Sequence, residues 1–335
     1  MRNYLALIAL FLVTTTQAQI ILPAYQAIQY RRNTLPTLIT SNICSITPIS
    51  ANCSSIVSND GGTPVTVRGI CWSTTTGPTI DLVTKTTDGS GIGSFLSSIT
   101  GLTLGVTYFV RAYATNNVGT AYGNELVFTT ISNTNLSSVQ ICNQIWTTMN
   151  LDVDTYTDCT PIPEVTDPTI WNSLTTGAWC YYNNDPANGL VYGKLYNWYA
   201  IMGIYDSASL NNPALRKKLA PFGWHIPSSS EWSILQTCLG GQLLAGDKMK
   251  EAGNLHWFPP SNGSNSSGFT ALPGGYRMAS NASNGASSIF GDLQSHAQFW
   301  CVESYIWTIT YHLSFLTLSG GYPAVGGLSV RCVKD

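Results

Sequence analysis

The sequence predicts a multidomain protein in which an all-β sandwich precedes an α+β domain. Between residues 37 and 130, segments such as TYFVRAYATN alternate apolar and polar side chains with the period of two that is typical of strands. After the polar stretch 131–138, two apolar stripes with helical spacing appear, followed by further alternating segments. Short helices followed by strands and long loops indicate an α+β domain, which we place at 139–335.

Composition and charge narrow the range of functions. The chain has 335 residues, enough for two or more domains. Only 10% of these residues are charged, against roughly 25% in ordinary soluble proteins. The net charge is −2 and the sequence contains no basic block. We therefore expect no nucleic-acid partner.

The first residues predict an export signal. Arg2 precedes the apolar run 4–13, which is too short to span a bilayer, and small residues stand before an expected cut after Ala18. A buried N-terminal strand is the alternative interpretation. We interpret residues 1–18 as a signal peptide and 19–36 as a leader or linker.

No later stretch of the sequence is long and apolar enough to predict a membrane span. We therefore expect the mature protein to be secreted or held at the cell surface, with no membrane span once the signal is removed.

The nine cysteines are interpreted as disulfide partners, because export leads to an oxidising compartment. No C-x-x-C pair and no zinc-finger spacing occurs, so we predict no metal site. The odd count leaves at least one thiol free or paired between chains. Cys53 and Cys71 are candidates to bridge two strands, although Cys44 competes with Cys53. The full set of candidates is Cys53, Cys71, Cys142, Cys159, Cys180, Cys238, Cys301 and Cys332.

The first module, 37–130, resembles a known repeat. Its segments RGICWSTT, KTTDGSGIGSFLSSITGL and TYFVRAYATNNVGTAYGNELVFTT are separated by glycine-, asparagine- and proline-rich turns. In this order they resemble the fibronectin-III/immunoglobulin-like repeats of secreted Bacteroidota proteins. The resemblance implies an immunoglobulin-like sandwich that serves as a spacer or docking module. Alternation within the last segment places Tyr108, Val110 and Ala112 on one face.

Two helices are predicted in the second module. The segment YGKLYNWYAIMG carries an apolar stripe at i, i+3, i+4 and i+7, formed by Leu195, Trp198, Tyr199 and Met202. The segment SSSEWSILQTCLGG carries a second stripe and ends at a glycine pair. The second stripe and this stop consist of Trp232, Leu235, Leu239, Gly240 and Gly241.

The stretch GWHIPSSSEW, residues 223–232, combines a histidine and a glutamate, as an acid–base pair does. Ser228 stands three residues before Glu231, which is the spacing of a helix capping box. We favour a structural corner, in which Gly223 allows a turn, Glu231 caps the helix and His225 packs between its two apolar neighbours. Acid–base work would require a third group that orients the histidine.

Two loop motifs suggest ligands but are better explained as turns. SGFTALPGGYR looks like a phosphate loop, yet it lacks the Lys-Ser/Thr ending and no helix follows. In YYNNDPANG, residues 183–185 offer calcium only one carboxylate, so an Asx turn is favoured. We predict a turn at Pro273, Gly274 and Gly275, with Arg277 pairing a carboxylate.

The order of motifs in the second module identifies a further resemblance. NQIWTTMNLDVDTY, YGKLYNWYAI, LRKKLAPFGWHIPSSSEW, AGDKMKEAG, SGFTALPGGYR and LSVRCVKD resemble the Fibrobacter succinogenes major paralogous domain over residues 139–335. The resemblance implies a fold related to C-type lectin-like domains and formylglycine-generating enzymes. It implies no particular activity, because the family has no settled one.

Departures from the family pattern bear on the cysteines. Cys301 is unusual where the family has a serine-rich run, and Glu303 roughly replaces the family's acid. Cys142 and Cys159 also look like additions. By the same resemblance, Cys180 and Cys332 occupy family cysteine positions.

The function predicted is that of a non-catalytic binding or adhesion module. Formylglycine-generating enzymes hold copper with a closely spaced cysteine pair, whereas Cys301 and Cys332 lie 31 positions apart. We therefore predict no enzyme activity and no cofactor. The expected partner is an extracellular polysaccharide or another surface protein. The alternatives are a purely structural envelope protein and, less favoured, an oxidase like the formylglycine-generating enzymes. Most aromatics, including Trp198 and Trp307, are expected in the core; the ligand-binding candidates are Trp257, Glu303, Tyr305, Tyr311 and Tyr322.

Overall fold

A computed structural model describes residues 33–130, 136–278 and 290–335 of the chain. The predicted signal peptide and most of the predicted leader and linker lie outside these residues. The chain divides into two compact units. The first takes Met1–Ser41, Ser55–Ser97 and Phe109–Val127, and the second takes Asn42–Ser54, Ser98–Tyr108 and Phe128–Asp335. Some sandwich strands therefore contribute residues to both units.

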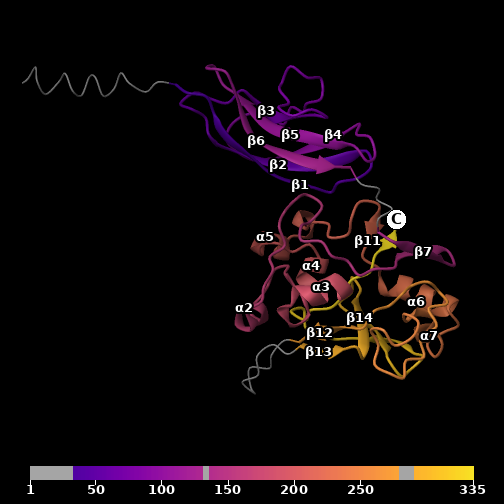
Figure 1. Cartoon of the computed structure of the whole chain (residues 1–335). Helices are drawn as coiled ribbons and strands as arrows, with labels where there is room; N and C mark the ends of the chain where they lie inside the picture. The colour runs from indigo at the N-terminus through magenta and orange to yellow at the C-terminus, as the bar shows by residue number, and fades with distance from the viewer. Residues whose placement is uncertain (1–32, 131–135, 279–289) are drawn as a thin grey trace, which may run out of the picture. The chain divides into compact units, whose positions relative to one another are not determined.

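Residues 37–129 form two three-stranded sheets and contain no helix (Figure 1). The predicted period of two is present: in β5, Tyr108, Val110 and Ala112 are all buried. The first sheet has the order β1 (Thr37–Cys44), β2 (Ser50–Asn59), β4 (Gly93–Thr100), and the second has the order β3 (Val67–Ser73), β5 (Thr107–Thr115), β6 (Thr120–Thr129).

The second unit combines short helices with small antiparallel sheets, as an α+β domain does. In Figure 1 its helices fall into two groups, with α2 to α5 on one side and α6 and α7 on the other. The described helices are α2 (Pro168–Asn172), α3 (Pro186–Tyr192), α4 (Trp198–Ile201), α5 (Ser207–Asn211), α6 (Ser229–Cys238) and α7 (Ala245–Met249), with the 3₁₀ turns η2 (Tyr182–Asn184) and η3 (Pro213–Leu215).

The strands of this unit that follow residue 136 form four sheets among the described residues. The largest joins the two ends of the 139–335 segment, because its order is β11 (Trp224–His225), β17 (Val333–Lys334), β8 (Gln144–Thr147), β7 (Ser138–Ile141). The others are β10 (Leu195–Tyr196) with β9 (Trp179–Cys180), β12 (Gly274–Arg277) with β13 (Phe290–Leu293), and β14 (His296–Trp300), β15 (Ile306–Thr310), β16 (Leu316–Ser319) in that order. Within the described ranges, no helix has the length and apolar character needed to cross a bilayer.

Of the two predicted helices, one is present and the other was largely wrong. Residues Ser229–Cys238 form α6, with Trp232 and Leu235 fully buried. At 195–202, by contrast, Leu195 and Tyr196 pair with β9, and only the single turn α4 follows. The Asn197 side chain caps that turn by accepting from the backbone amide of Ala200, so the helix cannot extend back through the apolar stripe.

Aromatic side chains form the core beneath α6. Trp232 lies 4.7 Å from Trp146 between ring centroids and stacks on Phe299 and Trp307 at 5.4 and 5.8 Å. All four rings are almost fully buried. The expectation that Trp307 belongs to the core is therefore confirmed.

Two disulfides are present, and they are not the bridge that the sequence suggested. Cys44 pairs with Cys159, both in the second unit, at a Cα separation of 5.3 Å. Cys142 pairs with Cys238, the last residue of α6, at 6.5 Å. Cys53 is buried and is not joined to Cys71.

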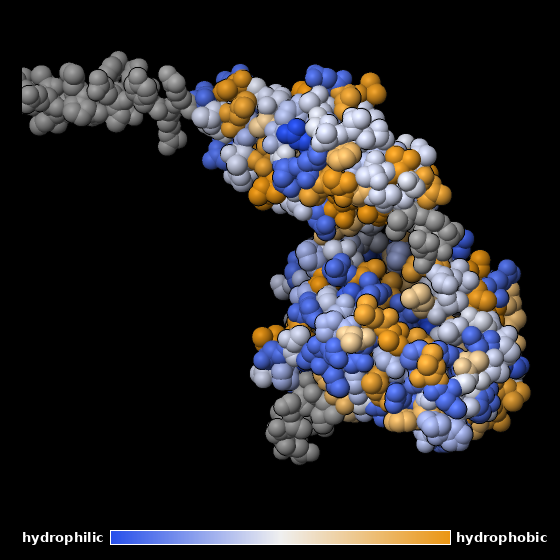
Figure 2. Space-filling model, viewed as in Figure 1, coloured by the Kyte–Doolittle hydropathy of each residue, from blue (hydrophilic) through white to orange (hydrophobic). Residues whose placement is uncertain are grey.

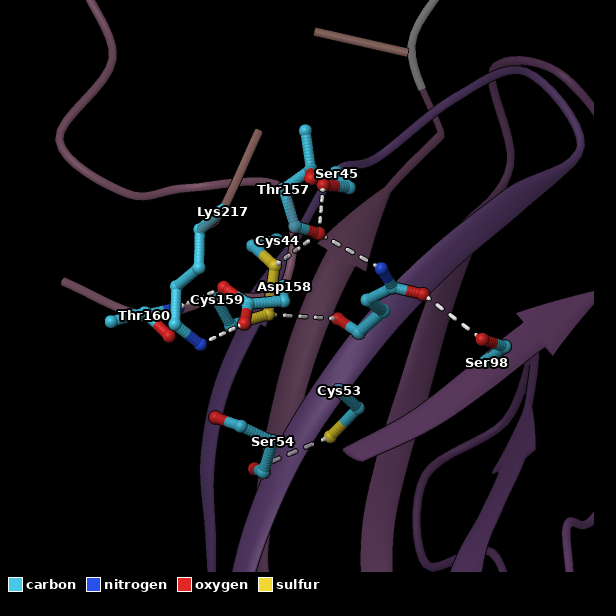
Figure 3. The surroundings of a disulfide bond; sticks show 11 residues. Cys44, Ser45, Cys53, Ser54, Ser98, Thr157, Asp158, Cys159, Thr160 and Lys217 are labelled. Carbon is cyan, nitrogen blue, oxygen red and sulfur yellow. Dashed lines mark hydrogen bonds and ion pairs between the residues drawn. A yellow bond between two sulfur atoms is a disulfide. The ribbon is translucent and has the colours of Figure 1, made fainter. Parts of the chain in front are cut away.

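The carbonyl of Thr157 holds the chain around the Cys44–Cys159 disulfide (Figure 3). It accepts from the Ser45 hydroxyl at 2.6 Å and from the Asn52 amide at 2.9 Å. The next residue, Asp158, forms an ion pair with Lys217. These contacts set the two cysteines side by side although 115 positions separate them in the sequence.

The remaining second-unit candidates, Cys180, Cys301 and Cys332, are buried thiols rather than disulfide partners. Burial raises the pKa of Cys180 to about 11 and that of Cys332 to about 12, and it also raises the pKa of Cys301. Such thiols are unreactive, because the thiolate is the nucleophile and the metal ligand.

A buried arginine connects the largest sheet to the loops beside it. Arg331 is fully buried, and its guanidinium donates to the carbonyls of Thr147, Phe269 and Thr270 at 2.6, 3.0 and 2.8 Å. It also donates to Oδ1 of Asn150 at 2.7 Å. Burial lowers the pKa of Arg331 to about 9. Backbone carbonyls thus compensate for the loss of water around the charge.

Arg277 has a similar environment, which corrects the sequence-based expectation. We expected it to pair a carboxylate, but its guanidinium donates to the carbonyls of Val165 and Thr166 at 2.6 and 3.0 Å. It lies 4.2 Å from the ring centroid of Trp171 and is fully buried. A third buried basic side chain, Lys250, also has its Nζ against backbone carbonyls. Long loops can be buried here because the two arginines satisfy their carbonyl groups.

We predict that Arg331→Met destabilises the fold by about 3 kcal/mol or more, because it leaves several buried acceptors without a donor. Urea unfolding of the two proteins would measure the difference. Lys334→Met is the control, since Lys334 is exposed and loses only a surface charge. Equal loss of stability in the two variants would contradict the role of Arg331.

Candidate functional site

The N-terminus of α6 forms the capping box that the sequence predicts. Ser228 is the N-cap, and its hydroxyl accepts from the backbone amide of Glu231 at 3.3 Å. Glu231 reaches back, so that its Oε2 accepts from the backbone amide and the hydroxyl of Ser228, both at 2.8 Å. Each residue therefore fixes the other, and the carboxylate lies where the helix dipole favours negative charge.

A second carboxylate caps the same helix from a distant part of the chain. Oε2 of Glu303 accepts from the backbone amide of Ser229 at 2.9 Å. Glu303 belongs to the turn 301–305 between β14 and β15, and it is exposed. The hydroxyl of Ser229 also lies 3.2 Å from the Cys301 sulfur. The helix start and this turn are thus held together.

His225 does not simply pack between Trp224 and Ile226, and this part of the sequence-based interpretation was wrong. Trp224 and Ile226 are buried, but the side chain of His225 points to the opposite face of the chain and is 35% exposed. Its Nε2 lies 2.6 Å from Oε1 of Glu231, and its Nδ1 lies 2.8 Å from Oδ1 of Asp335. Sequence reasoning missed Asp335, since pairing of β11 with β17 brings these residues together.

The two carboxylates bias the histidine toward its charged form. Burial disfavours the imidazolium, but the hydrogen bonds to Glu231 and Asp335 outweigh burial and raise the pKa of His225. For Glu231, burial favours the neutral acid, but the hydrogen bonds from Ser228 and His225 outweigh it and lower the pKa. His225 and Glu231 thus form an ion pair, and the carboxylate of Asp335 binds the other ring nitrogen of the histidine.

This corner contains the orienting group that acid–base work requires. Both ring nitrogens of His225 face carboxylates, and the nearby Ser228 hydroxyl donates to Glu231. Within the part of the chain that the structure describes, no cluster of three His, Cys, Asp or Glu residues can hold a metal ion. The side chains of this corner form an ion pair that depends on pH.

The five predicted ligand-binding residues do not form one site. Trp257 is 1% exposed and donates from its indole to the carbonyl of Ala271, so it belongs to the core. Tyr322 is half-buried, 5.8 Å from Trp300 between centroids. Tyr311 is half-buried against His312. The other two, Glu303 and Tyr305, share the turn 301–305, and both are exposed.

The family comparison covers the capping corner and the candidate binding residues, apart from Asp335. The model of the Fibrobacter succinogenes major domain matches residues 139–334, more than half of the chain. The chain belongs to this family. No curated protein matches the sequence.

Several solved structures are similar to about a third of the chain. They include the sensor domain of the anti-sigma factor RsgI4 in Pseudobacteroides cellulosolvens (13% identity, 30% of this chain, 99% of that chain, TM-score 0.24). The sixth fibronectin type III domain of human fibronectin type III domain containing protein 3 is 20% identical (30% of this chain, 92% of that chain, TM-score 0.24). Likeness at this level has no bearing on function.

Within the Fibrobacter succinogenes major domain, the glycine-rich loop needs a correction. Gly274 and Gly275 are not a turn: they begin β12, where Gly274 pairs with Leu293 of β13. Gly275 has a φ of +64°, and a Cβ there would lie 2.4 Å from the Gly291 carbonyl oxygen. Glycine is therefore required for close approach of two strands.

The asparagine-rich stretch of this domain is a turn and a helix start. Asn183 and Asn184 have positive φ values of 54° and 55°. Asp185 is the N-cap of α3 and accepts from the backbone amide of Ala187 at 2.9 Å. The single carboxylate of the stretch thus binds the backbone, as the Asx-turn interpretation predicts.

We predict a pH-dependent contribution of the corner to stability. Because the pKa of His225 is raised in the folded protein, its charged form stabilises the fold fully at pH values below the ordinary pKa of 6.5. This stabilisation is lost as the pH rises through the pKa of the folded state. Because the pKa of Glu231 is lowered in the folded protein, its carboxylate stabilises the fold fully at pH values above the ordinary pKa of 4.5. This stabilisation is lost as the pH falls through the pKa of the folded state. Both contributions are present between these two values.

His225→Gln should therefore be less stable than the wild type by about 1 kcal/mol or less at pH 5.5, because the groups are partly exposed. The difference should shrink by pH 9. Urea unfolding at the two pH values measures it, and His312→Gln, at an exposed histidine, is the control. A deficit that is independent of pH would contradict the ion pair.

Proposed function

We propose that the protein is a secreted or cell-surface binding module in which the second domain binds an extracellular polymer and the sandwich acts as a spacer. The turn 301–305 is the observation that carries this proposal. It presents the exposed carboxylate of Glu303 and the ring of Tyr305, 41% exposed, close together in sequence. A flat ring and a carboxylate suit the apolar face and hydroxyl groups of a sugar.

The turn is held rigidly, which supports a binding role. Besides the contact of Glu303 with the α6 start, the Cys301 amide donates to the Tyr305 carbonyl at 3.2 Å. Ser304 has a φ of +64°, so the turn has a defined shape. A surface that is already ordered loses little entropy when it binds a ligand. On the face drawn in Figure 2, hydrophobic and hydrophilic residues are intermixed.

We further propose that the second domain has a C-type lectin-like fold related to formylglycine-generating enzymes, but without enzyme activity. Pairing of β8 with β17, which brings both ends of the domain into one sheet, supports the fold. The residues do not fit the copper of those enzymes. Cys301 and Cys332 are buried thiols whose pKa values are raised by burial, and thiolates are what copper binds.

Export is supported by the two disulfides, because such bonds persist in oxidising compartments. The partner we propose is a polysaccharide, and the alternative of a purely structural envelope protein is an outcome of the test below.

We predict that residues 19–335 bind specific polysaccharides on a glycan array and that Tyr305→Ala weakens binding about tenfold or more, about 1.4 kcal/mol. Glu303→Gln should weaken binding less while keeping the fold. Phe222→Ala is the control, since Phe222 is 72% exposed and lies outside the turn.

Melting temperatures of all variants separate lost binding from lost folding. Absence of binding to any polysaccharide would favour the structural alternative. Equal weakening by the Tyr305 and Phe222 variants would move the binding surface away from the turn.

A further inference from the structure

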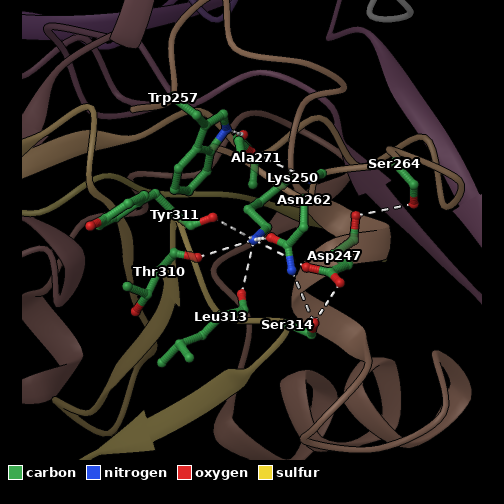
Figure 4. A network of polar contacts seen from close by, with 12 residues as sticks. Asp247, Lys250, Trp257, Asn262, Ser264, Ala271, Thr310, Tyr311, Leu313 and Ser314 are labelled. Carbon is green, nitrogen blue, oxygen red and sulfur yellow. Dashed lines mark hydrogen bonds and ion pairs between the residues drawn. The ribbon is translucent and has the colours of Figure 1, made fainter. Parts of the chain in front are cut away.

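Lys250 lies in the interior of the second unit, directly after α7 (Figure 4). Its side chain is fully buried, and its Nζ lies 3.1 Å from each of the carbonyl oxygens of Thr310 and Tyr311 and 2.9 Å from that of Leu313. The side-chain oxygen of Asn262 also contacts Nζ. Four oxygens thus compete for the three protons of an ammonium group, before any carboxylate is considered.

Asn262 is held against this amine by the loop that carries it. The next residue is Gly263, where an added Cβ would lie 2.8 Å from the Cβ of Lys250 and 2.3 Å from the Glu251 carbonyl oxygen. Only glycine permits the loop to approach so closely. Asn262 itself is exposed on its other side, so a small leaving group can reach solvent.

A carboxylate and a hydroxyl connect the amine to the amide nitrogen of Asn262. Oδ1 of Asp247 lies 3.1 Å from the Lys250 Nζ. Its Oδ2 accepts from the Ser314 hydroxyl at 2.5 Å, and the Ser314 oxygen accepts from Nδ2 of Asn262 at 3.1 Å. Amine, carboxylate, hydroxyl and amide therefore form a closed cycle, which the dashed lines of Figure 4 partly trace.

We propose that Lys250 and Asn262 are joined by an intramolecular isopeptide bond, formed with Asp247 and Ser314 as the proton relay. The amine, the amide carbon and the relay are all supplied by the folded chain. Because the fold holds the amine and the amide carbon side by side, they do not have to meet by diffusion. This proximity accounts for the reaction of an amide that is normally inert.

The step balances without any added reagent. Asp247 takes a proton from the Lys250 ammonium, and the free amine attacks Cγ of Asn262. The Nζ–Cγ bond forms and the Cγ–Nδ2 bond breaks. Nδ2 receives the two protons that Nζ loses, by way of Asp247 and Ser314, and leaves as an ammonium ion. Asp247 ends as a carboxylate, so the relay is regenerated and nothing is oxidised or reduced.

The surroundings favour the neutral amine that the attack requires. Burial lowers the pKa of Lys250, although the hydrogen bond and charge of Asp247 oppose this effect. Oδ1 of Asp247 is buried and forms the ion pair with Nζ, so it is in position to receive the proton. The Trp257 ring, centred 5.8 Å from Nζ, closes one side of the site.

The test is peptide mapping of the purified, reduced and alkylated protein. We expect a single tryptic peptide that is uncleaved after Lys250, closed into a loop by the bond between Lys250 and Asn262, with the loss of one ammonia, about 17 Da. Mass alone does not decide, because cyclisation of Asn262 onto the Gly263 amide loses the same ammonia. Fragment spectra distinguish the looped peptide, which gives no backbone fragments between residues 250 and 262, from the linear one.

Asp247→Asn and Ser314→Ala test the relay. The first should abolish the looped peptide, and the second should reduce its yield. Ser266→Ala is the control, since its exposed hydroxyl lies outside the cycle. Cleavage after Lys250 in the wild-type protein, with an unmodified or merely cyclised Asn262, would overturn the proposal. An undiminished looped peptide in Asp247→Asn would overturn the role of the relay.

Discussion

Burial of positive charge against backbone carbonyls is the interaction on which the second unit depends. Much of this unit is loop, and buried loops carry carbonyl groups that no strand or helix satisfies. Arg331 satisfies three of them and Arg277 satisfies two, each from a fully buried side chain. The Nζ of Lys250 lies against three more. A chain with few charged residues thus places two arginines and a lysine in its interior.

The same C-terminal segment links this interior to the surface corner. Arg331 anchors the chain just before β17, and β17 then pairs with β11 to bring Asp335 against His225. Glu231, which binds the other side of His225, begins the helix that covers the aromatic core. Glu303 binds that helix start from the turn that we propose as the binding surface. The shape of the turn therefore depends on contacts that begin with a buried arginine.

Local patterns in the sequence predicted the sandwich strands and the capped helix α6, because those signals depend on residues two to four positions apart. The stripe at 195–202 failed for a nonlocal reason: Leu195 and Tyr196 pair with β9, and Asn197 starts a new turn. The same limit applies to Cys44 and Asp335, whose partners are distant in sequence. Of the proposed binding residues, Glu303 and Tyr305 were predicted together, whereas Trp257 could not be told from a core residue by type alone.

Hydrogen exchange in the Arg331→Met variant tests the central role of the buried cations most directly. If Arg331 organises the loops whose carbonyls it binds, backbone amides in 147–151 and 265–271 should exchange faster in the variant than in the wild type, whereas strands of the sandwich should be unchanged. Unchanged exchange in both loops would contradict the account. So would acceleration spread equally over the whole chain, because the hydrogen bonds of the Arg331 guanidinium go to residues within these two segments.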